Sequence, residues 1–125
     1  MDIIVTNNGF STDTWSAETT LSIFSETDPE NLTLPNDIQR AVITFPNFAD
    51  GRGFTLAGLL RLREYSGALR AKGPIFSDQY AMARSSGFDE IAISQAQAVR
   101  QPEHDWLFRS NWTAHSYQSR LQASG

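Results

Sequence analysis

Short apolar runs alternate with segments of helical spacing between Gln39 and Ser94. The runs at residues 41–45, 68–76 and 90–94 have the length and the β-branched or aromatic content of strands, and the first is typical of a strand buried on both faces. The two segments between them predict helices, the first from leucines three and four positions apart. Because the connections are short, this strand–helix–strand–helix–strand order predicts three parallel strands in an α/β sheet.

Single residues predict where the two helices begin and end. Thr55 is a candidate N-cap of the first helix, and Gly67 suits the left-handed residue that often follows a helix. For the second helix, Ser77 or Asp78 is the candidate N-cap, and Gly87 is the expected stop. The first helix is therefore predicted to have about three turns.

The whole chain, residues 1–125, fits one α/β domain, because 125 residues allow a sizeable core but not a complete eight-stranded barrel. We predict a compact domain with an open or half-barrel-like sheet and its core in residues 39–94. Residues 1–38 hold two short runs, DIIV and LSIF, that predict edge strands, followed by a loop with two prolines.

The C-terminal segment, residues 95–125, is rich in aromatic and large apolar side chains. We expect these side chains to cover the sheet; the alternative is an exposed patch for a partner subunit. They are Trp106, Leu107, Phe108, Trp112, Tyr117 and Leu121.

The composition excludes several classes of chemistry. Without cysteine the chain has no disulfide, catalytic thiol or thiolate-bound cluster, and His104 and His115 are not spaced as metal ligands. We therefore expect no metal site and no tightly held cofactor. The formal net charge of −4 argues against a general nucleic-acid-binding protein, because phosphate contacts need a concentrated basic surface.

The pattern of apolar residues also bears on location. No apolar run approaches the roughly 20 residues that span a membrane. Residues 1–25 lack the basic start and continuous apolar centre of a secretory signal. We therefore expect a cytoplasmic protein with no membrane contact.

Candidate binding residues follow from the predicted topology, since ligands of parallel α/β sheets collect beyond the carboxyl ends of the strands. Asp50, Gly51 and Arg52 come after the first strand, and Asp78 and Gln79 come after the second. Arginine forms paired hydrogen bonds with carboxylate, phosphate or sulfate-like groups, and a neighbouring glycine allows close backbone approach. These residues predict an anion site; the alternative is that Asp50 and Arg52 fix a turn.

The second strand adds a basic residue to this candidate site. Arg70 and Lys72 occupy alternate positions, so one face of the strand is expected to meet polar surroundings. We expect Arg52 and Arg70 to converge on one pocket whose polar wall is completed by Asp78 and Gln79. Since a carboxylate repels an anion, Asp78 is expected to orient an arginine or to cap its own helix.

Motifs that bind nucleotides are missing from the sequence. The segment GRGFTL has two glycines of the dinucleotide fingerprint but Leu56 in place of the third. Neither a phosphate loop nor a G-x-S-x-G elbow occurs. A dinucleotide-binding fold and a serine hydrolase are therefore not expected.

A set of residues in the central half of the chain nevertheless matches a known pattern. They are Asp50-Gly51-Arg52, Leu60-Arg61 with Arg63, Gly67, Leu69-Arg70-Ala71 with Gly73, Asp78-Gln79, and Gly87-Phe88-Asp89. Through these residues the chain resembles the bacterial family known as domain of unknown function 934. Members of that family are described as oxidoreductases and are commonly encoded beside sulfite reductase and other enzymes of sulfate assimilation.

The resemblance implies a role in assimilatory sulfate and sulfite reduction. We expect an accessory protein that assists sulfite reductase or another sulfur-assimilation protein, since an independent oxidoreductase needs a held cofactor. The alternative is a small stand-alone, oxidoreductase-like enzyme that acts on an anionic substrate or cofactor at the Asp50, Arg52, Asp78 and Gln79 loops. Three parallel strands leave sheet edges and one sheet face that need cover, so we expect the N-terminal strands or the aromatic C-terminal segment to pack onto this unit, or a second copy of the chain to do so in a homodimer.

Overall fold

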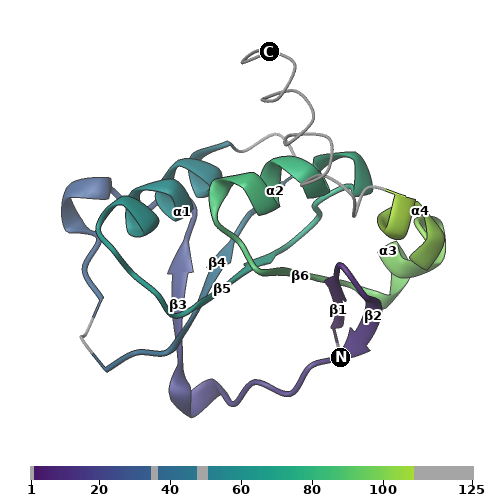
Figure 1. Ribbon diagram of the computed structural model, residues 1–125, viewed down its shortest axis with the longest axis horizontal. Helices are drawn as coiled ribbons and strands as arrows, with labels where there is room; N and C mark the ends of the chain where they lie inside the picture. The colour runs from purple at the N-terminus through teal and green to yellow at the C-terminus, as the bar shows by residue number, and fades with distance from the viewer. Residues whose placement is uncertain (1, 35–36, 48–50, 109–125) are drawn as a thin grey trace, which may run out of the picture.

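The computed structural model describes residues 2–34, 37–47 and 51–108. These residues form a six-stranded sheet of order β2-β1-β6-β5-β4-β3, with helices packed against it (Figure 1). The strands are β1 (Ile3–Thr6), β2 (Gly9–Thr12), β3 (Thr20–Phe24), β4 (Arg40–Thr44), β5 (Ala68–Lys72) and β6 (Glu90–Ile93). The helices are α1 (Arg52–Leu62), α2 (Tyr80–Ser86), α3 (Gln95–Arg100) and α4 (Glu103–Phe108), with short 3₁₀ turns η1 (Ala17–Thr19), η2 (Pro29–Asn31) and η3 (Ser77–Gln79). Of these helices, none has the length and apolar character needed to cross a membrane.

The predicted α/β core is confirmed. Strands β4, β5 and β6 pair in parallel, and α1 and α2 connect them in the expected order. In the register of these strands Val42 lies opposite Arg70, and Arg70 lies opposite Glu90. The sheet is open, because β2 and β3 form its two edges.

The two N-terminal runs extend the sheet on opposite sides. The run LSIF forms β3, which is the expected edge strand and pairs in parallel with β4. The run DIIV forms β1, and the prediction of an edge strand there is wrong, because β1 lies between β2 and β6 and is antiparallel to both. Its buried residues Ile4 and Val5 suit this interior position.

Helix α1 is shifted toward the N-terminus relative to the prediction. It begins at Arg52 with Gly51 as N-cap, so the prediction of Thr55 as the cap is wrong. The reason lies at Gly53, where a Cβ would come within 2.2 Å of the Phe45 ring, so the glycine serves close packing inside the helix and not a loop. The helix ends at Leu62, and Glu64, with φ of 69°, takes the left-handed position expected of Gly67.

The following elements agree better with the sequence. Strand β5 ends at Lys72, earlier than expected, because Gly73 turns the chain with φ of 139°. Helix α2 ends at Gly87 as predicted, with φ of 120°. Its N-cap is Gln79, so the prediction of Ser77 or Asp78 as the cap is wrong.

The hydrophobic core lies between the sheet and the helices α1 and α2, which run along one side of the sheet (Figure 1). The C-terminal segment contributes Trp106, which is buried and meets the Tyr80 ring edge-on at 6.2 Å. Its neighbours Leu107 and Phe108 are exposed. The other predicted docking residues, Trp112, Tyr117 and Leu121, lie outside the described residues. The strand and helix side chains of the core include Ala41, Ile43, Leu69, Ala71, Ile91, Ile93, Leu56, Ala57, Leu60 and Ala83.

Candidate functional site

Two of the predicted site residues lie together at the start of α1. Gly51 is the N-cap of this helix and Arg52 is its first residue; both are exposed. Arg52 lines a small cavity of about 120 Å³ together with Thr27 and Pro29, which precede and begin the η2 turn. Asp50 lies outside the described residues. The helix start therefore sits beyond the carboxyl end of β4, where the topology predicted it.

Asp78 and Gln79 lie together in η3, beyond the carboxyl end of β5. The side-chain oxygen of Gln79 accepts a hydrogen bond from the Phe76 backbone N–H at 3.0 Å. This contact closes the turn that leads into α2, so Gln79 has a structural task in the free chain. Asp78 is exposed. As predicted, both residues follow the second parallel strand.

Arg70 does not join these residues, and the expected pocket shared by Arg52 and Arg70 is wrong. Successive side chains of a strand point to opposite faces of its sheet. Leu69 and Ala71 belong to the core under the helices, so Arg70 points to the face away from α1. Its guanidinium contacts Asp13 and Glu90 in the middle of that face of the sheet.

Arg70 is the centre of a charged and aromatic cluster on that face. Only 4% of the residue is exposed, yet its guanidinium meets two carboxylates: Nη1 lies 2.9 Å from Asp13, and Nη2 lies 2.7 Å from Glu90. The Trp15 ring lies 3.9 Å from the Arg70 Cζ and 5.4 Å from the Arg40 Cζ, measured to the ring centroid. Two guanidinium groups from neighbouring strands thus share one indole ring, an arrangement favoured by cation–π attraction.

The electrostatics of Asp13 fit this arrangement. Burial alone would raise the pKa of the Asp13 carboxyl, but hydrogen bonds from the Trp15 N–H and from Arg70 outweigh burial and lower the pKa below its ordinary value. The Trp15 N–H lies 2.9 Å from the same carboxylate oxygen that Arg70 contacts. Asp13 is therefore held as an anion beside Arg70.

The polar strand face predicted from Arg70 and Lys72 is confirmed. Lys72 points to the same side as Arg70 and lies 3.6 Å from Asp2, and about half of its side chain is exposed. The side chains of Arg40, Arg70 and Lys72 form a basic row across β4 and β5, which we call the basic face. In the free chain, carboxylates from residues 2, 13 and 90 and the ring of Trp15 lie against it.

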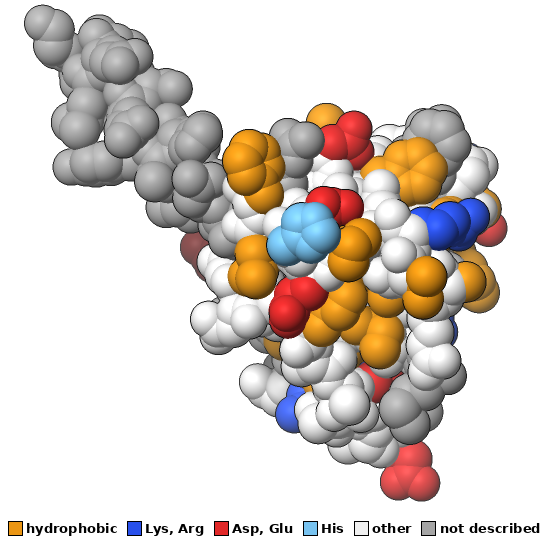
Figure 2. Space-filling model, turned by 90° about the vertical axis from the view of Figure 1, so that its right-hand side faces the viewer, with side chains coloured by type: hydrophobic (Ala, Val, Ile, Leu, Met, Phe, Trp, Pro, Cys, Tyr) orange, Lys and Arg blue, Asp and Glu red, His pale blue; other side chains and the backbone are white. Residues whose placement is uncertain are grey.

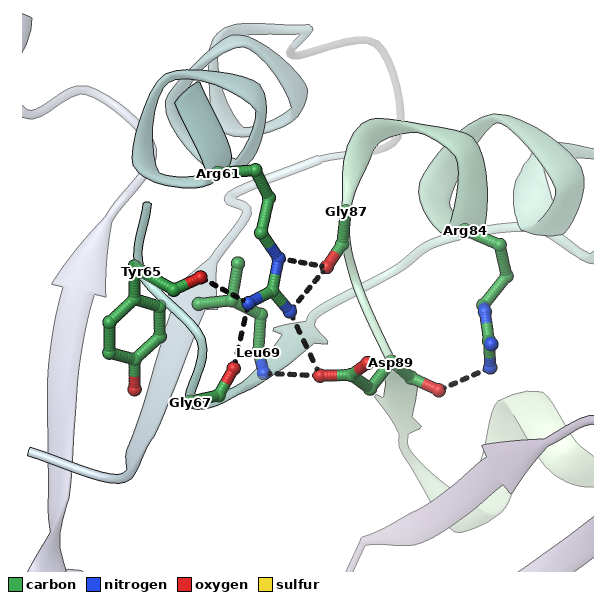
Figure 3. Close-up of polar contacts among 7 residues, drawn as sticks. All are labelled: Arg61, Tyr65, Gly67, Leu69, Arg84, Gly87 and Asp89. Atoms are coloured by element: carbon green, nitrogen blue, oxygen red, sulfur yellow. Dashed lines mark hydrogen bonds and ion pairs between the residues drawn. The ribbon is translucent and has the colours of Figure 1, made fainter. Parts of the chain in front are cut away.

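A second arginine centre lies at the amino ends of the strands (Figure 3). Arg61, near the end of α1, uses all five of its N–H groups. Nη1 donates to the backbone oxygens of Tyr65 and Gly67, while Nε and Nη2 both donate to the Gly87 oxygen. Nη2 also lies 3.0 Å from the Asp89 carboxylate.

Asp89 completes this centre, which we call the Arg61 clamp. The same carboxylate oxygen accepts a hydrogen bond from the Leu69 backbone N–H at 2.8 Å, and Arg84 donates to the Asp89 backbone oxygen (Figure 3). The clamp thereby ties the end of α1 to the starts of β5 and β6. Because every donor of Arg61 is used, the clamp holds the fold together and offers no free donor of that guanidinium to a ligand.

The structure also bears on metal binding. Within the described ranges, no group of three or more histidine, aspartate or glutamate side chains could hold a metal ion. His104 is exposed and its Nε2 lies 3.1 Å from the Asp105 carboxylate, a surface contact.

Sequence reasoning misses the partners of Arg70. Glu90 carries a usable signal, because it opens the next parallel strand and lies opposite Arg70 once the register is known. Asp13 and Trp15 carry none, since they stand in a polar stretch 57 and 55 positions earlier without hydrophobic periodicity. Most residues of the Arg61 clamp belong to the pattern of the family resemblance; Tyr65 and Arg84 do not. The contacts among them become evident in three dimensions.

Comparison with known proteins identifies one family. The model of a family described as "Bacterial protein of unknown function (DUF934)" matches residues 20–124, most of the chain. No curated protein matches the chain, and no solved structure does. The matched range contains Arg40, Arg70, Lys72 and the Arg61 clamp, whereas Asp13 and Trp15 precede it.

Proposed function

The chain belongs to this bacterial family of unknown function, and from that membership we propose that it is a cytoplasmic accessory protein of assimilatory sulfite reduction that binds sulfite reductase. The expected gene neighbourhood of the family, beside sulfite reductase, is the reason for naming this partner. The role proposed is to bind the reductase and to help it receive electrons or substrate, without a redox centre of its own.

The observation that supports binding over catalysis is that two arginines of the family pattern, Arg61 and Arg70, are engaged by groups of the chain itself. Arg61 donates all its N–H groups within the chain, and the charge of Arg70 is balanced by Asp13 and Glu90. A small anionic substrate would need these donors free, because an oxyanion is held by charge-assisted hydrogen bonds. Neither arginine offers such a site in the free protein, which weakens an enzyme built on them.

Exposed apolar side chains at one end of the molecule support a protein partner. In α3 and α4, 81% of Val99, 75% of Phe108 and 38% of Leu107 remain exposed. Figure 2 shows hydrophobic side chains gathered on this end, around a histidine. Apolar groups that gather on a surface commonly mark protein contacts. We call this surface the apolar end and take it as a candidate contact with the reductase.

Co-elution of the purified protein with purified sulfite reductase tests the proposal. We expect a complex in size-exclusion chromatography. Replacement of Phe108 by Ser should weaken it about tenfold, as loss of a buried aromatic contact commonly does. Met82, which is 54% exposed on α2, provides the control: Met82→Ser should leave the complex unchanged. Absence of co-elution at micromolar concentrations would remove sulfite reductase as the partner.

The alternative is an oxidoreductase-like enzyme that acts on an anionic substrate or cofactor at the carboxyl edge, favoured by the exposed Arg52 at the start of α1. The absorption spectrum separates the two functions. For an accessory protein we expect a colourless preparation that does not oxidise nicotinamide cofactors unaided. A stoichiometric bound flavin would favour the enzyme, and Arg52→Ala should then weaken anion binding while leaving the thermal unfolding temperature nearly unchanged.

A further inference from the structure

The basic face is covered in an unusual way. Parallel sheets are commonly covered by helices on both faces. Here α1 and α2 cover one face, and the segment between β2 and η1 passes the other, at the bottom of the view in Figure 1. Residues 13–16 of this segment have no regular secondary structure. Within this segment, the side chains of Asp13 and Trp15 contact the sheet.

These two residues form a compact unit. The Asp13 carboxylate accepts the Trp15 backbone N–H, which holds the carboxylate and the indole ring close together. The carboxylate then contacts Arg70, and the ring lies over Arg70 and beside Arg40. Both contacts are of kinds that proteins use to recognise ligands. One is an ion pair at hydrogen-bond distance, and the other is an aromatic ring stacked on a guanidinium group.

The two sides of this contact differ in their relation to the family. Arg40, Arg70, Lys72 and Glu90 lie in the range that matches the family model, while Asp13 and Trp15 lie before its first residue. The basic face thus lies within the matched range, and the segment that covers it lies before that range. Lys72, with about half of its side chain exposed, continues the basic row beyond the covered part.

We propose that the basic face is a binding site for an acidic and aromatic peptide segment of a partner protein, and that Asp13 and Trp15 occupy this site in the free chain. A partner segment with a carboxylate and an aromatic ring two positions apart would replace both contacts at Arg70 and Arg40. This inference rests on the proposed accessory role, because that role requires a partner protein. It adds the chemical character of the segment with which the partner binds.

A peptide supplied in trans tests the site. The probe is a fluorescein-labelled peptide with the sequence of residues 11–17, Ser-Thr-Asp-Thr-Trp-Ser-Ala, titrated against the full-length D13A/W15A variant by fluorescence anisotropy. We expect saturable binding to this variant and at least about tenfold weaker binding to the wild type. The wild type carries the competing segment at an effective concentration on the order of millimolar. A peptide with Ala in place of Asp and Trp should not bind.

Further variants localise the binding. In the D13A/W15A background, Arg40→Met should weaken peptide binding about tenfold, whereas Arg63→Met, a change of an exposed arginine on the α1 C-cap, should not. Circular dichroism establishes that each variant is folded. If D13A/W15A does not fold, the single W15A variant, which keeps the Asp13–Arg70 ion pair, takes its place. No binding to a folded variant, or equal binding before and after Arg40→Met, would overturn the site.

The outcome is distinguishable from that of the proposed function. Peptide binding without co-elution of sulfite reductase would keep the site and remove the named partner. Co-elution without peptide binding would keep the partner and show that Asp13 and Trp15 are a permanent structural cover of the sheet.

Discussion

Gly67 lies where a side chain has no room. A Cβ at this position would come within 2.2 Å of the Tyr65 hydroxyl and 2.7 Å of the Gln39 backbone oxygen. Gly67 is not the helix end that its position after the leucines predicted, because α1 ends at Leu62. It instead gives space to the turn that leads from α1 into β5. A backbone oxygen cannot move aside as easily as the end of a side chain, so the turn itself would have to shift.

We therefore expect Gly67→Ala to destabilise the protein by about 1–3 kcal/mol, the usual cost of overpacking. Gly58 offers a matched control inside α1, where a Cβ would meet nothing closer than the Ser86 oxygen at 3.9 Å. Gly58→Ala should stabilise by about 0.4–1 kcal/mol, because alanine loses less conformational freedom on folding. Urea unfolding of both variants measures the difference; equal stability of Gly67→Ala and the wild type would show that the turn relaxes freely.

Arg70 illustrates what a single residue can and cannot disclose from sequence. Its alternation with Lys72 correctly predicts a polar strand face. The sequence alone does not determine whether Arg70 or its neighbour Leu69 points to the helices. In the structure Leu69 belongs to the core, so the polar face lies on the other side of the sheet. The partners Asp13 and Trp15 then come from a segment whose path depends on tertiary contacts and not on local pattern.

At the scale of elements, the three central strands were predictable because each is a short apolar run between turn residues, and each connection between them holds the helix that a parallel crossover needs. The helix ends were less predictable. Gly53 resembles a loop residue but packs inside α1 against Phe45, and Glu64 takes a left-handed conformation that is more common for glycine. Strand β1 pairs with β6 across most of the chain length, a contact that no local pattern indicates.

The contacts of the Arg61 clamp predict how strongly α1 is joined to β5 and β6. Arg61→Met keeps much of the aliphatic stem but removes the donors that serve the backbone oxygens of Tyr65, Gly67 and Gly87. We expect a loss of about 3 kcal/mol, from two or more hydrogen bonds to a charged group at about 1.5 kcal/mol each. Arg63→Met is the matched control: the exposed Arg63 side chain donates to the Leu32 backbone oxygen, and its loss should cost less than about 1.5 kcal/mol.

Chemical denaturation compares the two arginine variants. A loss for Arg61→Met no larger than that for Arg63→Met would mean that water replaces the clamp, and that the links between α1, β5 and β6 are carried by apolar packing alone.

At the scale of the whole molecule, the two edges of the sheet differ in how far other parts of the chain cover them. At the β2 edge the Glu103 carboxylate, from α4, accepts the Phe10 backbone N–H at 2.8 Å, so a helix covers part of that edge. At the other edge, β3 exposes Ser22 and 59% of Phe24. Open strand edges pair readily with other strands, and a strand that pairs with its own copy gives a two-fold dimer. The β3 edge is therefore the place where we expect the homodimer to form.

The hydrogen bonding of β3 allows a precise test of this dimer. The Ser25 N–H donates to the Thr44 oxygen of β4, so the alternate N–H groups, at Ser22 and Phe24, point toward the outer edge. Ser22→Pro should block a second strand at that edge without removing a bond to β4, whereas Ser22→Thr should leave the edge intact. In sedimentation velocity we expect a dimer for the wild type and for Ser22→Thr, and a folded monomer for Ser22→Pro. A monomeric wild type at concentrations well above those in a cell would refute the dimer, and a dimeric Ser22→Pro would place its interface on another surface.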